Sequence, residues 1–481
     1  MSDQQRPNII LFTTDQHRGD WIGLAGESPI ETPNLDAWVN NGAYFRHAYT
    51  EIPSTTGARR VLHLGQGSYD CGVVGYGGGP WEEEISLPGV LANAGYHCLN
   101  AGWRNMHPRR RLFGYHNAII HDLRPGVDDY WEWLQAELGP NAYERTHGSD
   151  ANGWLARPWH YEEKYHPTVW TVDTALKMIE KRDPTRPFFM WCSHLRPHSP
   201  YDPPQFYWDM YINQDLGEPP IGDWAEAHRR PDERPDRTAW QGDLGAERTH
   251  RCRAGYMGCI TQIDYQMGRM EEMLRRIDGV DLNNTIWLFT SDHGDMMGDH
   301  YLHRKTYAYE GSARIPFVVR YPRGCDAPTG EFDQPVGLQD VMPTLLDLAG
   351  VQAPDTMTGE SVLKAARGED WREFMHGEHS PCYAPDNATQ YITDGHAKFI
   401  WNPINGTEHF FDLDADPQET RDLIDDEASQ ERVGLWRQRL IDRLATRDDG
   451  FSDGEKLITK PEGYGPWVEG YGPDHVGKKE E

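Results

Sequence analysis

The stretch NIILFTTDQH, residues 8–17, decides the fold class of this 481-residue chain. Its first six residues form a short apolar run, which is typical of a strand buried on both faces of a parallel sheet. Two similar runs occur later, PFFMWCS at residues 187–193 and TIWLFT at residues 285–290. Polar residues follow each run, and functional sites of open α/β sheets form at the carboxyl ends of strands.

Helical patterns alternate with the apolar runs over the first 370 residues. We predict helices at 32–42, 87–94, 168–180, 256–277 and 339–350, and further strands at 97–101 and 315–321. The first of these helices is expected to have Thr32 as its N-cap. This alternation predicts an α/β fold, a large and mostly parallel sheet sandwiched by helices.

The pattern changes after about residue 370, where short strand-like runs are separated by turn residues and precede a charged helix near 426–447. We predict a catalytic α/β domain at 1–370, a smaller C-terminal α+β subdomain at 371–462, and a tail at 463–481. The tail is rich in Gly, Pro and aromatic residues, and a homo-oligomer through this tail is one expectation. Residues 201–250, 121–135 and the tail are expected to shape the substrate pocket.

Composition limits the partners of the chain. A net charge of -29 argues against nucleic acid and anionic membranes, and an anionic substrate would need local basic residues. No apolar run reaches transmembrane length, and the N-terminus does not resemble a signal peptide. Seven cysteines are scattered without metal-binding spacing, which is typical of free thiols. We therefore expect a cytoplasmic protein.

Two of the predicted strands end in residues that could bind a metal. Asp15 and Gln16 follow the first strand, and Asp292 and His293 follow the strand at 285–290. If these strands are neighbours, two carboxylates, an amide oxygen and an imidazole converge, which suits one divalent ion. Mn²⁺ or Ca²⁺ is favoured, with Mg²⁺ or Zn²⁺ as alternatives. The competing interpretation, in which each Asp caps a helix, stays open from the sequence.

The stretch TEIPSTTGARRVLHLG, residues 50–65, holds a candidate nucleophile. Thr55 is expected at the start of a helix, where backbone N–H groups favour anions, and Arg59 lies one turn further on. A nearby metal would bind the Thr55 hydroxyl and activate it as a nucleophile. The alternative is that Thr55 is an ordinary helix cap and Arg59 a solvated charge, and this stretch alone leaves both interpretations open.

Five motifs in the same order resemble those of the sulfatase family, within the alkaline phosphatase superfamily. They are RPNIILFTTDQHRGD at 6–20, TPNLDAWVNNGAYFRHAY at 32–49, FTSDHGDMMGDHYLHRKTYAYEGSARIPFVVRYP at 289–322, DVMPTLLDLAG at 340–350 and FFDLDADPQETRDL at 410–423. The resemblance implies an alkaline phosphatase-like fold and metal ligands at Asp15, Gln16, Asp292 and His293. It also implies that His198 assists the leaving group, that Lys305 binds the transferred anion, and that His107 lies near the nucleophile.

The chain departs from the family pattern at the nucleophile. Thr55 stands where sulfatases carry a Cys or Ser that is oxidised to formylglycine, and threonine is not a substrate for that oxidation. Gly57 and Ala58 replace the usual Pro and Ser. In addition, Asn105 stands at a position where lysine is usual, with Arg104 beside it as a possible substitute, and Tyr76 stands where asparagine is common.

These departures change the expected chemistry. Hydrated formylglycine releases its sulfated intermediate by elimination through a second hydroxyl, which threonine lacks. Water must then attack the central atom, as in phosphodiesterases and phosphonate hydrolases that use Ser or Thr at this position. We therefore predict a hydrolase of a small anionic phosphoester, a diester or phosphonate monoester, with a covalent Thr55 intermediate and one metal. A sulfatase acting without formylglycine and a non-catalytic metal- or anion-binding relative are the alternatives.

Overall fold

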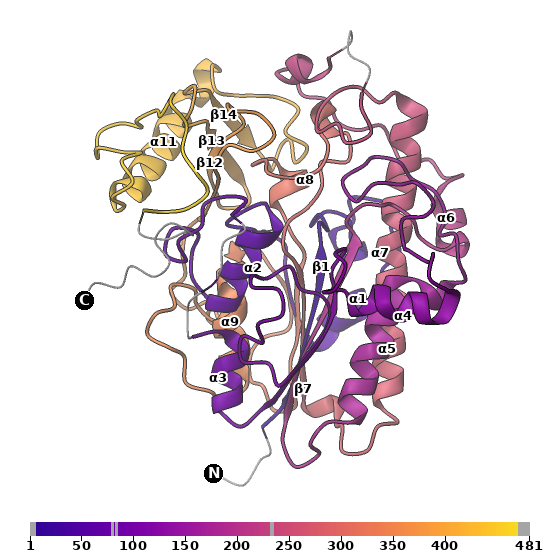
Figure 1. Cartoon of the computed structure of the whole chain (residues 1–481). Helices are drawn as coiled ribbons and strands as arrows, with labels where there is room; N and C mark the ends of the chain where they lie inside the picture. The colour runs from indigo at the N-terminus through magenta and orange to yellow at the C-terminus, as the bar shows by residue number, and fades with distance from the viewer. Residues whose placement is uncertain (1–5, 78–80, 82–84, 231–234, 470–481) are drawn as a thin grey trace, which may run out of the picture.

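The structure, a computed structural model, describes residues 6–77, 81, 85–230 and 235–469 (Figure 1). Its centre is an eight-stranded sheet in the order β5-β4-β6-β1-β7-β8-β2-β9. These strands are β1 (Asn8–Asp15), β2 (Gly42–Phe45), β4 (His97–Trp103), β5 (Asn117–His121), β6 (Phe188–Pro197), β7 (Thr285–Ser291), β8 (Phe317–Arg320) and β9 (Gly330–Phe332). Only β8 runs antiparallel to its neighbours, so the prediction of a mostly parallel sheet is confirmed.

Alternate residues of β1 bury their side chains on opposite faces of the sheet, as the two-residue period of a strand requires. Ile9 and Leu11 pack in a core with three helices, α2 (Thr55–Leu64), α3 (Leu87–Asn93) and α9 (Val341–Leu348). Ile10 and Phe12 pack in a second core with α5 (Pro167–Glu180) and α7 (Ala246–Leu274). Helices therefore cover both faces of the sheet (Figure 1). Each apolar run of the sequence is fully buried for this reason.

The C-terminal subdomain contains a four-stranded antiparallel sheet and one long helix (Figure 1). Its elements are β11 (Met375–His379), β12 (Thr389–Thr393), β13 (Ala397–Trp401), β14 (Glu408–Asp412) and α11 (Gln430–Ala445). Phe399 and Phe410 of the sheet share a core with Trp436 and Leu440 of α11. This arrangement confirms the predicted smaller α+β subdomain.

The described part of the tail packs on its own chain. The backbone N–H of Val74 donates to the carbonyl of Pro466 at 2.8 Å, and that of Val468 donates to Gly72 at 3.1 Å. The predicted homo-oligomer through the tail stays a prediction, and the last residues of the tail lie outside the described part. No helix in the described ranges is long and apolar enough to cross a membrane.

The remaining elements are short. They are α1 (Pro33–Asp36), α4 (Asp129–Leu138), α6 (Gln205–Tyr211), α8 (Glu310–Ala313), α10 (Val362–Ala366), β3 (Ala48–Tyr49) and β10 (Val336–Gly337). The helix predicted at 32–42 is thus a single α-turn followed by the 3-10 helix Ala37–Asn41.

Thr32 holds the N-cap position of helix α1, as predicted, but its side chain makes no capping hydrogen bond. The Thr32 hydroxyl instead accepts from the backbone N–H of Gly23 and donates to the Asp36 carboxylate, both at 2.8 Å. The Asp264 carboxylate, which α7 brings to this point, accepts from the backbone N–H groups of Asn34 and Leu35 at 3.1 and 2.7 Å. A side chain more than 200 positions away therefore satisfies the first N–H groups of the helix.

Candidate active site

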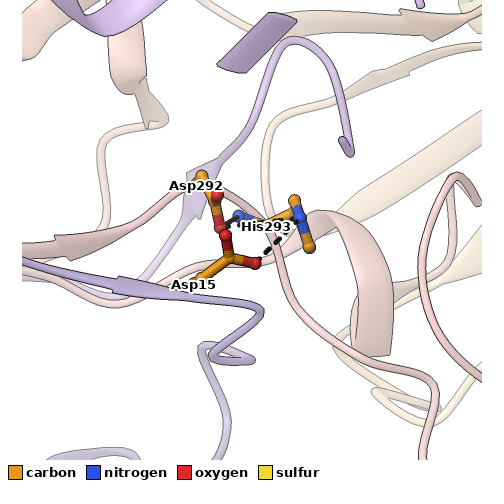
Figure 2. A group of neighbouring side chains, drawn as sticks. All are labelled: Asp15, Asp292 and His293. Carbon is orange, nitrogen blue, oxygen red and sulfur yellow. Dashed lines mark hydrogen bonds and ion pairs between the residues drawn. The ribbon is translucent and has the colours of Figure 1, made fainter. Parts of the chain in front are cut away.

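The register of the central strands brings two carboxylates together. β1 and β7 are parallel neighbours, and Thr14 pairs with Ser291, so Asp15 and Asp292 follow at the same edge. The metal-binding atoms of Asp15, Asp292 and His293 all lie within 4.8 Å of one another. Figure 2 shows the two carboxylates and the imidazole pointing toward one another. The predicted convergence of these two strand ends is therefore present, and all three side chains are buried.

The imidazole of His293 is oriented by the backbone. Its Nδ1 donates to the carbonyl of Gly294 at 2.9 Å, which leaves the Nε2 lone pair free. Nε2 lies 3.7 Å from Asp15 Oδ1 and 3.6 Å from Asp292 Oδ1. Burial, with the nearby Lys305 ammonium, lowers the pKa of His293 to about 3. A neutral imidazole with a fixed tautomer is the form that binds a cation.

Gln16 supplies a fourth candidate ligand. Its backbone has a φ of 71°, in the left-handed region, and its amide nitrogen donates to Asp295. The amide oxygen, Oε1, is buried and has no hydrogen-bond partner among the described residues. Because buried polar atoms are nearly always paired, this oxygen beside Asp15 indicates that a ligand belongs there. Two carboxylates, an amide oxygen and a neutral imidazole fit a divalent cation.

The Thr55 hydroxyl faces this group. Thr55 is the first residue of α2, and its Oγ1 lies 3.3 Å from Asp15 Oδ2 and 3.2 Å from His293 Nε2. The Lys305 ammonium donates to Thr55 Oγ1 at 3.4 Å. Ser54 holds the N-cap position, although its side chain makes no capping bond. The interpretation of Thr55 as an ordinary helix cap is therefore wrong.

Arg59 is buried one turn further along α2. Its guanidinium contacts Asp15 Oδ2 at 3.3 Å and Asp292 Oδ2 at 3.4 Å, and it donates to the carbonyl of Trp103 at 2.7 Å. It is not a solvated surface charge, because only 3% of its side chain is exposed. Arg59 therefore adds a fixed positive charge beside Thr55.

Thr55 opens onto a cavity of about 380 Å³ that His198 and Lys305 also line. The other lining residues are Tyr76, Trp103, Asn105, Arg109, Asp122, Leu123, Arg124, Ala151, Asn152, Leu195, Arg304, Thr306, Cys382 and Tyr383. Residues of the segment 121–135 thus shape this cavity as expected. The described residues of the segment 201–250 and of the tail contribute none of the lining residues.

His198 is held at the cavity by β6, which pairs with β1 as far as Pro197 opposite Asp15. Its backbone N–H donates to the carbonyl of Asp15 at 3.0 Å, and its Nδ1 donates to the carbonyl of Ser199 at 2.9 Å. Burial, with the Lys305 ammonium, lowers the pKa of His198 to about 3. The other ring nitrogen, Nε2, is therefore the atom that remains for proton transfer.

The structure does not bring every predicted residue to the site. Within the described part of the chain, His107 is not among the residues that line the cavity, and its side chain is partly exposed. Arg104 does not substitute for a lysine at position 105, because its guanidinium donates to backbone carbonyls, including that of Arg111 at 2.6 Å. Arg109 instead lines the cavity, and it donates to Asn105 Oδ1 at 3.1 Å.

The sequence analysis missed the contacts of two residues at this site, Trp103 and Asp295. The indole N–H of Trp103 donates to Asp15 Oδ2 at 2.5 Å, and Asp295 accepts both the Gln16 amide and the Tyr201 hydroxyl. Trp103 could have been identified from the sequence, because it ends β4 and β4 neighbours β6 in the sheet. A residue at the carboxyl end of that strand is expected near the site. Asp295 follows β7 in the same loop as Asp292, but nothing in the spacing indicates that it orients Gln16.

Comparisons with known proteins agree with this geometry. The model of the Sulfatase family matches residues 7–351, and that of the N-sulphoglucosamine sulphohydrolase C-terminal region matches residues 298–446. An arylsulfatase of Clostridium perfringens is 40% identical, covering 94% of this chain and 97% of that protein.

Solved structures share the fold. The phosphonate monoester hydrolase of Agrobacterium radiobacter superposes with a TM-score of 0.77 at 22% identity, covering 92% of this chain and 96% of the other. The phosphonate monoester hydrolase of Silicibacter pomeroyi superposes with a TM-score of 0.74 at 21% identity, covering 96% and 100%. The family match extends over most of the chain, and the buried Asp–Asp–His group lies within the matched residues. The chain therefore belongs to the sulfatase family of ester hydrolases, within the alkaline phosphatase superfamily.

Proposed function

We propose that this sulfatase-family hydrolase transfers a phosphoryl or phosphonyl group from a small anionic ester first to Thr55 and then to water. The observation that carries the proposal is the position of Thr55 Oγ1, within 3.4 Å of Asp15, His293 and Lys305. A hydroxyl placed among a carboxylate, an imidazole and an ammonium is positioned to lose its proton and to be stabilised as an alkoxide.

The nucleophilic step uses Thr55 and Arg59 of α2 together with residues at or after the ends of β1, β6 and β7. The Thr55 hydroxyl gives its proton to the Asp15 carboxylate and forms an Oγ1–P bond, while the bond from phosphorus to the leaving oxygen breaks. Lys305 and Arg59 neutralise the equatorial oxygens. His198 donates a proton to the leaving oxygen. Because the pKa of His198 is low in the free protein, the negative charge of the bound ester is required to raise it first.

The second step restores Thr55. Water attacks phosphorus and gives a proton to the neutral His198, the Oγ1–P bond breaks, and Thr55 regains its proton from Asp15. The sum of the two steps is one ester and one water converted to one acid and one alcohol. Threonine has no second hydroxyl, so the covalent intermediate cannot be released by elimination. Water must therefore attack the central phosphorus or sulfur atom of the intermediate directly. That requirement favours a phosphoester, either a diester or a phosphonate monoester, over a sulfate ester.

We propose that Asp15, Gln16, Asp292 and His293 hold one divalent ion, with Mn²⁺ or Ca²⁺ favoured over Mg²⁺ or Zn²⁺. The unpaired Gln16 Oε1 supports this assignment. A cation at this position supplies positive charge that favours the deprotonated form of a nearby hydroxyl. A single ion also provides less charge for a dianion, which favours diesters and phosphonate monoesters over phosphate monoesters.

A sulfate ester is the second candidate substrate, since the 40% identical relative is an arylsulfatase.

The deciding experiment measures turnover of four substrates with the same aryl leaving group: a sulfate ester, a phosphate monoester, a phosphodiester and a methylphosphonate monoester. Each divalent ion is added in turn. Thr55→Ala and Thr55→Ser are assayed alongside the native protein, and acid-quenched protein is examined by mass spectrometry for modified Thr55. Phosphonate or diester cleavage that Thr55→Ala abolishes supports the proposal. Sulfate ester cleavage as the best activity, or full activity in Thr55→Ala, contradicts it.

A further inference from the structure

The cavity at Thr55 is basic although the chain as a whole is acidic. Its described wall carries Arg109, Arg124, Arg304 and Lys305 against one acidic residue, Asp122. The net charge of the whole chain is -29. Arg59 and Lys305 already lie beside Thr55, where they can neutralise the transferred anion. The further positive charges of the wall are therefore not needed for that anion.

The four basic residues of the wall differ in whether a carboxylate neutralises their charge. Arg109 forms an ion pair with Asp122, and Lys305 points to Thr55. Arg124 is exposed to solvent. Arg304 is half-buried, and among the described residues it forms no ion pair with a carboxylate. Arg304 is therefore the half-buried cation of this wall whose charge is left uncompensated.

The guanidinium of Arg304 is fixed by neutral groups. Its two terminal nitrogens donate to Asn152 Oδ1 at 3.0 Å and to the carbonyl of Thr238 at 3.3 Å. The guanidinium carbon lies 4.5 Å from the ring centroid of Tyr383. The Nε atom is buried and has no hydrogen-bond partner among the described residues. A rigid cation in a cavity wall whose charge no carboxylate neutralises is suited to bind an anionic group.

The backbone at Arg304 supports a functional reason for this side chain. Its φ is 69°, in the left-handed region that glycine adopts far more readily than arginine. The conformation is held by the backbone N–H of Arg304, which donates to Asp295 Oδ1 at 2.9 Å. Asp295 also accepts from Tyr201, so the loop is anchored behind the metal-binding residues. An unfavourable conformation that retains a charged side chain at an active site indicates that the side chain is used.

We propose that Arg304 binds a second acidic group, carried by the leaving alcohol or phenol of the substrate. The substrates would then be esters of hydroxy acids, such as hydroxybenzoates, rather than of uncharged alcohols. This inference rests on the proposed function, because it assumes that the transferred group lies beside Thr55 and Lys305. On that assumption, Arg304 is left to contact the leaving part of the substrate.

The test compares phenyl and meta-carboxyphenyl esters of whichever transferred group supports turnover. In native protein the carboxylated ester should have the higher kcat/KM. In Arg304→Gln and Arg304→Gly this preference should fall about 10- to 100-fold, the range for loss of one charge-assisted hydrogen bond. Arg304→Lys should recover part of it. Arg276→Gln, which removes an exposed guanidinium just beyond the C-terminus of α7, with 69% of its side chain exposed, should keep the native preference.

Binding of the products separates this inference from the proposed function. Ligand-observed NMR titration of meta-hydroxybenzoate and phenol needs no turnover, so it applies even if no phosphonate or diester is cleaved. Tighter binding of meta-hydroxybenzoate to native protein, lost in Arg304→Gly, supports the inference. Equal binding of the two compounds, an unchanged preference in Arg304→Gln, or an equal loss for both esters overturns it. The last result would place Arg304 on the transferred group instead.

Discussion

Replacing Arg447 by Met should destabilise the C-terminal subdomain strongly. Arg447 follows α11 and donates to both oxygens of Glu378 in β11, at 2.8 and 2.9 Å. Glu378 also accepts from Gln390 and Ser68, at 2.8 and 2.5 Å, and is fully buried. Ser68 lies just beyond α2, so this network joins the subdomain to the main domain.

The magnitude follows from the burial and the pKa of Glu378. Burial by itself raises the pKa of this carboxyl, but the attraction of Arg447 and His376 outweighs burial and lowers the pKa to about 2. At about 1.4 kcal/mol per pKa unit, the difference from the ordinary value corresponds to roughly 3 kcal/mol of stability near neutral pH. Removing one partner of a buried ion pair typically costs about 3–5 kcal/mol, so the two estimates agree.

The direction in which the free energy of unfolding changes with pH distinguishes the loss of the ion pair from the loss of side-chain packing. In native protein the depressed pKa contributes stability above pH 4.5 that is lost as the pH falls toward 2. In Arg447→Met the buried, unpaired Glu378 should have a raised pKa, so the variant should become relatively more stable as the pH falls below 7. Urea unfolding followed by tryptophan fluorescence at pH 5 and pH 7.5 measures both effects.

The double variant Arg447→Met/Glu378→Gln is the matched control, and it should recover a large part of the loss because no fully buried charge is left unpaired. The other carboxylate partner of Arg447, Asp449, has 18% of its side chain exposed, so its unpaired charge costs less. A loss below about 1 kcal/mol in Arg447→Met, the size of a surface ion pair, would refute the reasoning. A single variant with the same pH dependence as the native protein would also refute it.

Three further predictions concern the site and its support. Trp103→Phe removes the indole donor to Asp15, so kcat/KM should fall about 10-fold or more with little change in melting temperature, whereas unchanged activity would show that this contact is dispensable. Gln16→Ala should weaken divalent-ion binding about 10- to 100-fold in a titration calorimeter, and native affinity in this variant would exclude Gln16 as a ligand. Asp264→Ala uncaps helix α1, and the free energy of unfolding in urea should fall by about 1–2 kcal/mol. A loss within error of zero would mean that solvent replaces the cap.

Much of the fold and of the metal site could be predicted because the signals are local. Three apolar runs identified β1, β6 and β7, and parallel pairing forces the residues after β1 and β7 to one edge. The position of Thr55 at a helix start was also visible in the sequence. These inferences needed only the strand period and the rule that sites form at strand ends.

The failures share a different cause, since each depends on contacts between distant segments. The local pattern located the N-cap position of helix α1 at Thr32, but it could not show that the capping hydrogen bonds come from Asp264. Arg104 and Arg109 are close in sequence, but only the turn after β4 decides which of them faces the cavity. In an irregular loop no repeating pattern of residues indicates which way a side chain points, so the sequence alone could not distinguish the two arginines.

The order of the sheet has a consequence for how the protein reaches its active form. Asp15 and Asp292 lie at the ends of neighbouring strands but are 277 positions apart in the sequence. The other neighbour of β1 in the sheet, β6, comes from near residue 190. Closing chain loops of this length is slow, because entropy is lost before any contact rewards it. No early folding intermediate can therefore hold the complete site. Recovery of hydrolysis after dilution from denaturant should lag behind the recovery of helical signal, and it should report on the completion of the central strand pairings.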